Sequence, residues 1–350
     1  MSDMFSFLRK IHLPFFSDFV VYVDIGTVNT KLAVKDKGIV LKDDTYIGYN
    51  TRIKAPIFFG KEAKTILGKT PDFVNIIRPV VNGVISDFDA EVQLLKKFFE
   101  KSIYLYFTNY LIKPSIQAVT SVPSIASEIE RKAVEEALIK VGCSQVFLIE
   151  RPIANIAGYG VNIFSHQPNI IVDLGGGLIE IAIVSGGGVV KEKTLKNAGE
   201  HMNKLIYNYI YLKYGVILGE NTCNTLKVTL LNFKDKEASA TIRGKSLETG
   251  LPKSIRVKSS DIKESLLGNF HQIVDGIKEL IEASPPEIVE DIYRRGIILT
   301  GGLATIEGID SFFANELKID VSRPENPSDN TIHGLIRLGR NKDNIAKLQI

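Results

Sequence analysis

The chain of 350 residues has no tryptophan and two cysteines, and it lacks any run of about 20 apolar residues of the kind that spans a bilayer. We therefore expect no membrane-spanning helix. Cys143 and Cys223 lie far apart, and neither they nor the five histidines show the spacing of metal ligands. A zinc site is not expected, and two isolated thiols favour the reducing environment of the cytoplasm.

An excess of charge of one sign is missing as well. The 43 basic and 40 acidic residues leave a net charge of only +3. Proteins that bind nucleic acid usually carry a concentrated basic stripe, so we expect no nucleic-acid partner. The composition is that of a globular protein, and the length is typical of two domains.

The first 16 residues differ from the rest because apolar side chains recur there at near-helical spacing. Pro14 would end such a helix, and Arg9 and Lys10 lie beside the apolar stripe, as in helices that lie in a membrane interface. The alternative is a segment that packs on the body of the protein or on a partner chain. No small-residue cleavage site follows, so a signal peptide is not expected. The candidate membrane contacts are Phe5, Phe7, Leu8 and Ile11.

Two stretches half a chain apart share one pattern. The first, FVVYVDIGTVNTKLAV, is an apolar run that ends in Asp24, passes through a glycine turn and returns as a strand. The second, NIIVDLGGGLIEIAIV, does the same after Asp173. Each pattern predicts a buried strand, a tight turn and a returning strand. Two such hairpins predict two related α/β domains that face each other.

Further elements can be predicted around the hairpins. We expect strands at residues 116–122, 146–149 and 297–300, and helices at residues 152–159, 202–212 and 261–283. Ser127 and Glu130 form a capping box before another helix. Its apolar face would consist of Ile129, Ala133, Val134, Ala137, Leu138 and Val141. Residues 228–257 are charged with short β-like runs, and we interpret them as a small insertion on the second domain.

A nucleoside triphosphate needs backbone donors around its phosphates. Glycine turns supply them, because the backbone can approach closely where no Cβ atom intervenes. The turns Gly26–Asn29 and Gly175–Gly177 are suited to this role, and Thr27 and Asn29 add side-chain donors. These two turns therefore predict a phosphate site.

The two aspartates at the strand ends would face the same cleft. Two carboxylates repel a polyphosphate unless a cation lies between them, so we expect Mg²⁺ near Asp24 and Asp173, mostly held through water. A third glycine turn, Gly301-Gly302, follows a short apolar run. Three turns with two aspartates are a much more specific pattern than one turn alone.

From about residue 19 to residue 339, the sequence resembles the MreB family of bacterial actins, because matching motifs follow one another in the same order along the chain. The matching motifs are DIGTVNT, KGIVL, IRPVVNGVISDF, VPSIASEIERKAV, IERPIANIAGYG, DLGGGLIEIAIVSGGGVV, GKSLETGLPKSI and PPEIVEDIYRRGIILTGG. The resemblance implies an α/β, actin-like (ribonuclease-H-like) ATPase fold with two related domains around a nucleotide cleft. It also implies ATP or ADP with Mg²⁺, and head-to-tail filaments, usually paired, that serve cell shape or cytoskeletal organisation.

The resemblance further implies a position in the cytoplasm at the inner face of the cell membrane. Leu111 and Ile112 are additional candidates for membrane contact, although they could simply begin the strand at residue 116. Paralogous filament proteins are further candidate partners.

The family divides each domain into a larger and a smaller subdomain. The implied boundaries are an N-terminal segment at 1–18, subdomain IA at 19–48 and 84–160, IB at 49–83, IIA at 161–197 and 263–340, IIB at 198–262, and a tail at 341–350.

The sequence departs from the family where water would be activated. The family has two glutamates before the proline, and the second, which is expected to position the attacking water, is Arg151 here. Arginine stays protonated and cannot act as a general base, and the retained Glu150 would point about 100° away along a helix. Leu178 and Ile179 replace two threonines after the second turn. We therefore expect nucleotide binding with slow hydrolysis, and Arg151 would either offset phosphate charge or turn outward to solvent.

Other departures lie toward the nucleoside. Asn224 replaces an acidic residue before the retained Lys227, and Leu303 replaces the third glycine of its turn. Gly199-Glu200 stands where a Gly-Asp turn is expected. The implied nucleotide contacts are Gly26, Thr27, Val28, Asn29, Gly175, Gly176, Gly177, Gly199, Glu200, Asn224, Lys227, Gly301, Gly302, Leu303 and Ala304.

Two other classes of protein use similar turns. A sugar or acetate kinase of the same superfamily would need a carboxylate that serves as a base, and Asp87 is the nearest candidate. A heat-shock-type chaperone ATPase would need a separate substrate-binding domain, and the chain ends soon after the expected ATPase core. A polymerising protein with weak ATPase activity remains the leading hypothesis, with the kinase as the alternative.

Overall fold

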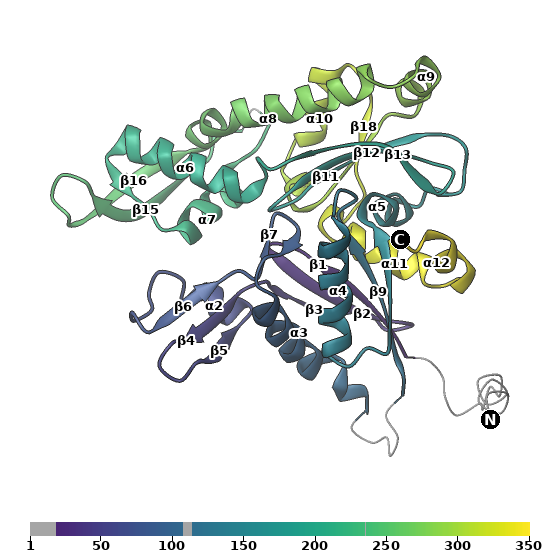
Figure 1. The fold of residues 1–350 in the computed structure, drawn as a ribbon. Coiled ribbons are helices and arrows are strands. Elements are labelled where there is room, and N and C mark those ends of the chain that lie inside the picture. The colour runs from purple at the N-terminus through teal and green to yellow at the C-terminus, as the bar shows by residue number, and fades with distance from the viewer. Residues whose placement is uncertain (1–18, 108–113, 235) are drawn as a thin grey trace.

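Each half of the chain builds a five-stranded sheet in the computed structural model, which describes residues 19–107, 114–234 and 236–350 (Figure 1). The first sheet has the order β10 (Gln145–Glu150), β9 (Ile116–Val122), β1 (Phe19–Ile25), β2 (Asn29–Val34) and β3 (Gly38–Asp44). The second has the order β13 (Gly188–Leu195), β12 (Ile179–Ser185), β11 (Asn169–Leu174), β17 (Ile297–Thr300) and β18 (Val321–Ser322). In both sheets an antiparallel hairpin is joined by a parallel neighbour of its first strand. The prediction of two related α/β halves is confirmed.

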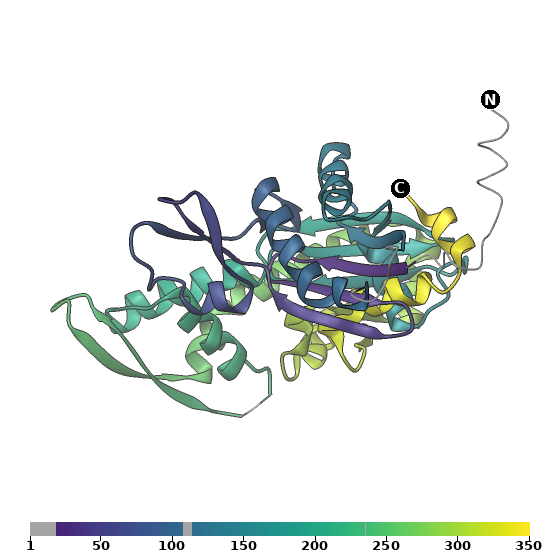
Figure 2. The same ribbon diagram turned by 90° about the horizontal axis from the view of Figure 1, so that it is seen from below.

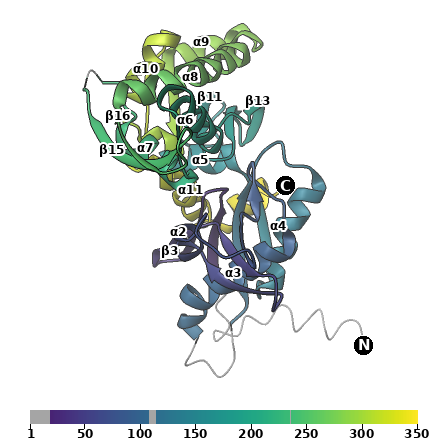
Figure 3. The same cartoon turned by 90° about the vertical axis from the view of Figure 1, so that its left-hand side faces the viewer.

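Helices cover the outer face of each sheet and fill the space between the sheets (Figures 1 and 3). Those on the first sheet are α3 (Phe88–Ser102) and α4 (Glu128–Lys140), with η1 (Tyr104–Phe107) after α3. Those on the second are α8 (Ser259–Glu282), α9 (Pro286–Arg295) and α10 (Ile309–Leu317). Those toward the centre are α5 (Arg151–Tyr159), α11 (Asn330–Leu338) and α12 (Lys342–Leu348), with η2 (Gly302–Thr305) and η3 (Pro327–Asp329) beside them.

The strand β1 shows why the central strands of the two sheets are apolar at nearly every position. Val21 and Val23 face the core under α3 and α4, whereas Val20 and Tyr22 face the central core with α5 and α11. Because successive strand residues point to opposite faces, a sheet covered on both sides needs apolar residues at every position. A buried strand of this kind carries its last residues, including Asp24, into the interior.

The two central helices cross at unusually close range. A Cβ atom on Gly334 of α11 would lie 1.7 Å from the carbonyl oxygen of Ala154, and one on Gly158 of α5 would lie 2.2 Å from that of Asn330. Only glycine permits this crossing. It packs α5 of the first half closely against α11, which follows the second sheet.

Two smaller sheets extend from the same side of the molecule (Figures 1 and 2). The first sheet is formed by β4 (Ile47–Asn50), β5 (Ala55–Phe59) and β6 (Val74–Ile77), and the helix α2 (Lys61–Thr65) lies between β5 and β6 in sequence. The hairpin of β7 (Val80–Val81) and β8 (Val84–Ile85) follows. The second sheet is formed by β14 (Val216–Ile217), β15 (Ser239–Ser246) and β16 (Pro252–Lys258). The helices α6 (Gly199–Tyr214) and α7 (Glu220–Leu230) belong to the same part of the chain. The segment expected as short β-like runs at 228–257 is thus the end of α7 and one long hairpin.

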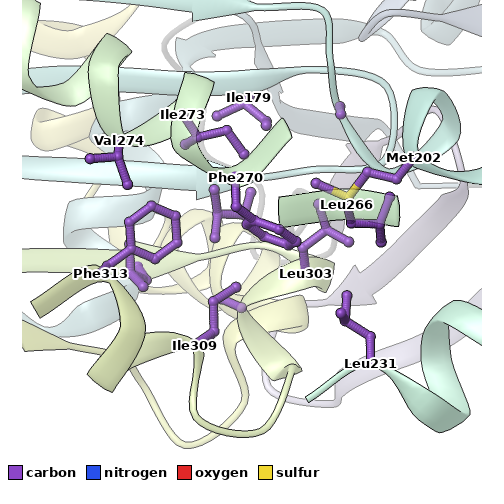
Figure 4. Packing of buried hydrophobic residues seen from close by; sticks show 14 of the residues in the cluster. Ile179, Met202, Leu231, Leu266, Phe270, Ile273, Val274, Leu303, Ile309 and Phe313 are labelled. Carbon is purple, nitrogen blue, oxygen red and sulfur yellow. The ribbon is translucent and has the colours of Figure 1, made fainter. Parts of the chain in front are cut away.

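The core of the second half is built around Phe270 of α8. Figure 4 shows this ring among Leu303, Ile309 and Phe313, and the centroids of the two phenylalanine rings lie 6.5 Å apart. Leu303 therefore packs against the core as well as following the third glycine turn.

One predicted helix face is partly wrong. The capping box of Ser127 and Glu130 starts α4 as expected, and Val134, Ala137 and Leu138 are buried. Ile129, however, is 82% exposed. At about 100° per residue it lies about 180° around the helix from Leu138, so it cannot share the buried face.

Glu91 of α3 is fully buried and its carboxylate oxygens have no hydrogen-bond partner among the described residues. Burial raises its pKa from 4.5 to about 8. The folded state therefore binds the proton more tightly than the unfolded state, and this group costs stability increasingly as the pH rises from about 4.5 to about 8.

We therefore expect Glu91→Gln to stabilise the protein by about 2–4 kcal/mol at pH 8 and by little at pH 4.5. Urea unfolding at both pH values measures the difference. Glu100→Gln, at an exposed position on the same helix, is the matched control and should change stability little at either pH. An equal effect of Glu91→Gln at both pH values would contradict the assignment.

Candidate nucleotide-binding site

Each hairpin turn is closed by its first glycine. The N–H of Gly26 donates to the carbonyl of Asn29 at 3.1 Å, and the N–H of Gly175 donates to the carbonyl of Leu178 at 3.1 Å. A Cβ atom on either glycine would lie 2.5–2.6 Å from that carbonyl oxygen. The two turns therefore have the same local geometry, as their sequences predict.

The tips of the two turns meet across the centre of the molecule. A Cβ atom on Gly176 would lie 2.2 Å from Val28 Cγ2, and one on Gly177 would lie 2.3 Å from Thr27 Oγ1. Thr27 Oγ1 also accepts a hydrogen bond from the N–H of Gly83 at 2.9 Å. Glycine is needed here for close approach between halves of the chain, since neither residue has a positive φ.

The third turn approaches the second aspartate. Gly301 has a φ of +88°, and a Cβ atom there would lie 2.5 Å from Asp173 Oδ1. Thr300 Oγ1 donates to the same carboxylate at 3.4 Å. The turn after β17 thus holds Asp173 in place from the side.

The first amides of α6 hold the second turn. The N–H of Gly199 donates to the carbonyl of Gly175 at 3.2 Å, and the N–H of Glu200 donates to that of Gly176 at 2.7 Å. Helix N-termini often bind anions through such amides. Here these two are already bonded, so the role of Gly199-Glu200 is to position the turn.

A cavity of about 340 Å³ lies between the turns. Most of the site residues that the sequence predicts line this cavity. They are Asp24, Gly26, Thr27, Val28, Asn29, Arg151, Asp173, Gly175, Gly176, Gly177, Gly199, Glu200, Asn224, Lys227, Gly301, Gly302 and Leu303. Glu150 does not line it and is the half-buried residue before α5. Ala304 is buried in η2, where its carbonyl accepts from Arg323 at 2.7 Å.

The proposed membrane contacts fall outside the described residues; they are Phe5, Phe7, Leu8, Ile11, Leu111 and Ile112.

Several cavity residues were not predicted from the sequence. They are Lys31, Lys42, Tyr46, Lys64, Gly83, Asn203, Glu220, Asn221, Val228, Ser328 and Thr331. Lys31 could have been found by local reasoning, because the hairpin register places it opposite Asp24. Helical spacing could also have indicated Asn203, Glu220, Asn221 and Val228, which lie within four positions of predicted contacts on α6 and α7. The others reach the cavity from distant segments.

The first aspartate is paired with a lysine of its own hairpin. Lys31 Nζ lies 3.0 Å from Asp24 Oδ2, with both side chains buried. The same ammonium donates to the carbonyl of Ser328 at 2.6 Å and lies 3.8 Å from Asp329. The ammonium group of Lys31 thus neutralises the carboxylate of Asp24 directly.

The second aspartate has a glutamate at the corresponding position. Glu180 lies opposite Asp173 across the hairpin, as Lys31 lies opposite Asp24. Arg151 Nη1 lies 3.1 Å from Glu180 Oε2, and its Nη2 donates to the carbonyl of Ile25 at 3.4 Å. Arg151 therefore joins both hairpins. The expectation that it could turn outward to solvent is wrong, because it is buried.

Of the buried pair, Arg151 is the member that keeps its charge. Burial raises the pKa of Glu180 to about 7, and Arg151 opposes this shift. Burial also works against the charged guanidinium, but Glu180, Asp24 and Asp173 outweigh it and raise the pKa of Arg151. The other oxygen of Glu180 accepts from the N–H of Ser124 at 3.2 Å. Arg151 is thus a fixed cation beside the cavity.

The two aspartates fit a protein-bound Mg²⁺ poorly. Asp24 already pairs with Lys31, and burial raises the pKa of Asp173. Among the described residues, no group of three or more His, Cys, Asp or Glu side chains could hold a metal ion. The donors that a hard cation prefers are therefore few and partly committed.

The structure places no hydroxyl or carboxylate side chain at the three positions where the family resemblance implies water-holding groups, namely 151, 178 and 179. Leu178 is buried and presents its side chain to the cavity, and Ile179 is fully buried in the core. Glu150 lies away from the cavity, and burial raises its pKa against the effect of Arg131. No carboxylate thus takes the place that Arg151 occupies.

Beside the N-terminus of α6, the cavity is lined by amide side chains and by a lysine whose ammonium is already hydrogen-bonded. Lys227 Nζ donates to the carbonyl of Gly199 at 2.5 Å and to Asn203 Oδ1 at 2.8 Å. Burial lowers its pKa to about 8. Asn224 and Leu303 line the cavity beside it. These residues combine amide and apolar side chains with one buried lysine, a lining that suits a nucleoside.

The mouth of the cavity is bridged by Arg78, which follows β6. Its Nη1 lies 2.8 Å from Glu200 Oε1, and its Nη2 pairs with Glu220. Its Nε donates to Tyr46 Oη at 2.8 Å. One guanidinium therefore connects the small sheet of the first half to the first turns of α6 and α7.

Asp87, the base candidate for a kinase, has a structural role. Its side chain accepts from the N–H of Ala90 at 3.0 Å and caps α3. It is not among the cavity-lining residues of the described chain. The geometry therefore does not favour the kinase alternative.

Comparisons with known proteins agree with this geometry. The family model described as MreB/Mbl protein matches residues 19–347. The cell shape-determining protein Mbl of Bacillus subtilis is 35% identical over 330 residues, which cover 94% of this chain and 98% of that protein. The cell shape-determining protein MreB of Escherichia coli is 32% identical over 326 residues, which cover 91% and 92%.

Solved structures show the same fold. MreB5 of Spiroplasma citri bound to ADP matches with a TM-score of 0.85 and 30% identity over 91% of this chain and 95% of that one. The same protein bound to AMPPNP matches with a TM-score of 0.86 and 29% identity over 95% and 98%. A MamK double helical filament, at 20% identity and a TM-score of 0.76 over 93% and 99%, shares the fold. No helix in the described residues is long and apolar enough to cross a membrane.

Proposed function

This chain belongs to the MreB/Mbl family, and from that premise we propose that it is a filament-forming cytoskeletal protein of cell shape that binds ATP or ADP and hydrolyses ATP slowly. The observation that carries the slow hydrolysis is the buried ion pair between Arg151 and Glu180. It stands at the position where the family places a water-activating glutamate.

Nucleotide binding is supported by the cavity and by the bound nucleotides of related structures. The neighbours from Spiroplasma citri hold ADP and AMPPNP. In this chain the turns at Gly26–Asn29 and Gly175–Gly177 would cradle the phosphates. Asn224, Lys227 and Leu303 would lie toward the nucleoside. The cavity has roughly the size of a small-molecule site.

Slow hydrolysis follows from the chemistry of the residues beside the turns. A guanidinium cannot accept a proton from water at any physiological pH. Leu178 offers no hydroxyl, and Glu180 is occupied by Arg151 and the Ser124 amide. The site would therefore retain ATP longer than a site with a free carboxylate at position 151.

Other expectations remain part of this proposal. The four subdomains with the boundaries given above, the paralogous filament partners and a peripheral position at the inner membrane face come from the family resemblance. Mg²⁺ held through water by Asp24 and Asp173 also remains an expectation, and the pairing of Asp24 with Lys31 argues against a strong requirement.

Sedimentation tests the function. We expect the purified chain to pellet as filaments when ATP is added, and electron microscopy of the pellet should show them. A small-molecule kinase would remain in the supernatant, so a chain that never pellets with ATP, ADP or a non-hydrolysable analogue would contradict the proposal. With anionic vesicles added, loss of vesicle binding on removal of residues 1–16 would support membrane contact, and unchanged binding would oppose it.

A further inference from the structure

We propose that the nucleotide site carries its own fixed cations, Lys31 and Arg151, so that it binds nucleoside di- and triphosphates with little dependence on a divalent metal. This inference rests on the proposed nucleotide binding and specifies the form of the ligand, namely the metal-free polyphosphate. It follows from how the two hairpins place their charges.

Lys31 occupies the place where a metal near Asp24 would act. Its ammonium is 3.0 Å from the carboxylate, and the carbonyl of Ser328 holds it there at 2.6 Å. Both Lys31 and Asp24 line the cavity. The β1–β2 register sets this pairing, since the two residues face each other directly across the hairpin. The carboxylate that would otherwise repel a phosphate is therefore already neutralised.

Arg151 does the same for the second hairpin. It pairs with Glu180, the residue opposite Asp173, and it also bonds the carbonyl of Ile25 in the first hairpin. Its guanidinium lines the cavity between the two turns. A guanidinium presents several donors in a fixed plane, which suits phosphate oxygens as well as carboxylates.

The charge balance of the cavity floor follows. Asp24 and Asp173 line the cavity together with the buried cations Lys31 and Arg151, and Glu180, which pairs with Arg151, is a third buried carboxylate outside that lining. A glutamate at position 151 would remove one cation and add one carboxylate, a change of two charges. With arginine there, the two buried cations balance the two aspartates of the lining, so the protein itself removes much of the repulsion that a divalent ion would otherwise have to offset.

The remaining lysines of the lining lie away from the two strand-end aspartates. Lys42 pairs with Asp329 at 2.7 Å, Lys64 pairs with Asp44, and Lys227 donates to the carbonyl of Gly199 and to Asn203. Lys42 is 45% exposed, so water and salt screen it more strongly than the buried pair. Lys31 and Arg151 are therefore the buried cations of the lining that act directly on Asp24 and Asp173.

Equilibrium binding of a fluorescent ATP analogue tests the inference. For the full chain we expect Kd in excess EDTA to stay within about threefold of Kd in excess MgCl₂. Lys31→Met should lose about tenfold or more in affinity in EDTA and regain most of it in MgCl₂, because the metal can then replace the missing charge. Lys31→Arg should behave like the unmodified chain.

The control is Lys37→Met, at an exposed position in the turn between β2 and β3, which should leave both affinities unchanged. Thermal melting of each variant shows whether it is folded. If Lys31→Met does not fold, Arg151→Glu should make binding depend on MgCl₂ by the same reasoning.

The outcomes are distinct. Binding of the unmodified chain only with MgCl₂ would overturn this inference and leave the proposed function intact. No binding in either condition would overturn the proposed function. A folded Lys31→Met that binds normally in EDTA would exclude Lys31 as the source of the effect.

Discussion

Replacing Arg151 with glutamate should raise the rate of ATP hydrolysis by about 10- to 100-fold, measured as phosphate release in a single turnover with excess MgCl₂. A positioned general base typically contributes about 10²–10⁴-fold. The lower range applies here because Leu178 and Ile179 would still lack the hydroxyls that help to hold water. The new carboxylate would stand between the two turns, where the guanidinium now lies 3.1 Å from Glu180.

The comparison variant is Arg151→Gln, which removes the charge without supplying a base. It should change the rate far less than Arg151→Glu. Excess MgCl₂ keeps nucleotide binding from limiting the measurement of either variant. Rapid release by the unmodified chain, or an equal gain from glutamine and glutamate, would show that Arg151 is not what slows hydrolysis.

Replacing Arg78 with alanine should speed the dissociation of bound nucleotide by about tenfold, or ~1.4 kcal/mol. This side chain alone bridges Tyr46, Glu200 and Glu220 at the mouth of the cavity. Charge-assisted hydrogen bonds contribute about 1.5–3 kcal/mol each, and this figure must be reduced because the bridge is partly exposed to water. Without the bridge, α6 loses its ion pair to Arg78 and α7 keeps the hydrogen bond from Asn221 to the carbonyl of Lys64 at 2.8 Å, so the cavity opens more often.

Stopped-flow displacement of a fluorescent nucleotide by excess unlabelled ATP measures this rate. Arg52→Ala is the matched control, because Arg52 stacks on Phe73 at 4.1 Å in the same part of the chain and does not line the cavity. An unchanged rate in Arg78→Ala, or an equal increase in Arg52→Ala, would refute the role of the bridge. High salt should also speed dissociation from the unmodified chain, since it screens the exposed part of the bridge.

Local patterns in the sequence predict much of the site. An apolar run that ends in Asp24 or Asp173, then a glycine turn and a returning strand, predicts both hairpins with their aspartates. The register within a hairpin also follows from the turn, so the pairing of Asp24 with Lys31 could have been read from the sequence. The error at Ile129 was one of counting, because helical geometry alone places it away from the buried face.

The sequence by itself thus determined the paired turns, their aspartates and the loss of a base at Arg151, because turns, caps and alternation depend on residues a few positions apart. Only the tertiary structure decided where that guanidinium points. Its partners, Glu180 and the carbonyl of Ile25, are 29 and 126 positions away. The bridge from Arg78 to Glu200 and Glu220 likewise depends on how the two halves meet. Contacts of this kind arise from packing of whole sheets and helices, and no local spacing in the chain encodes them.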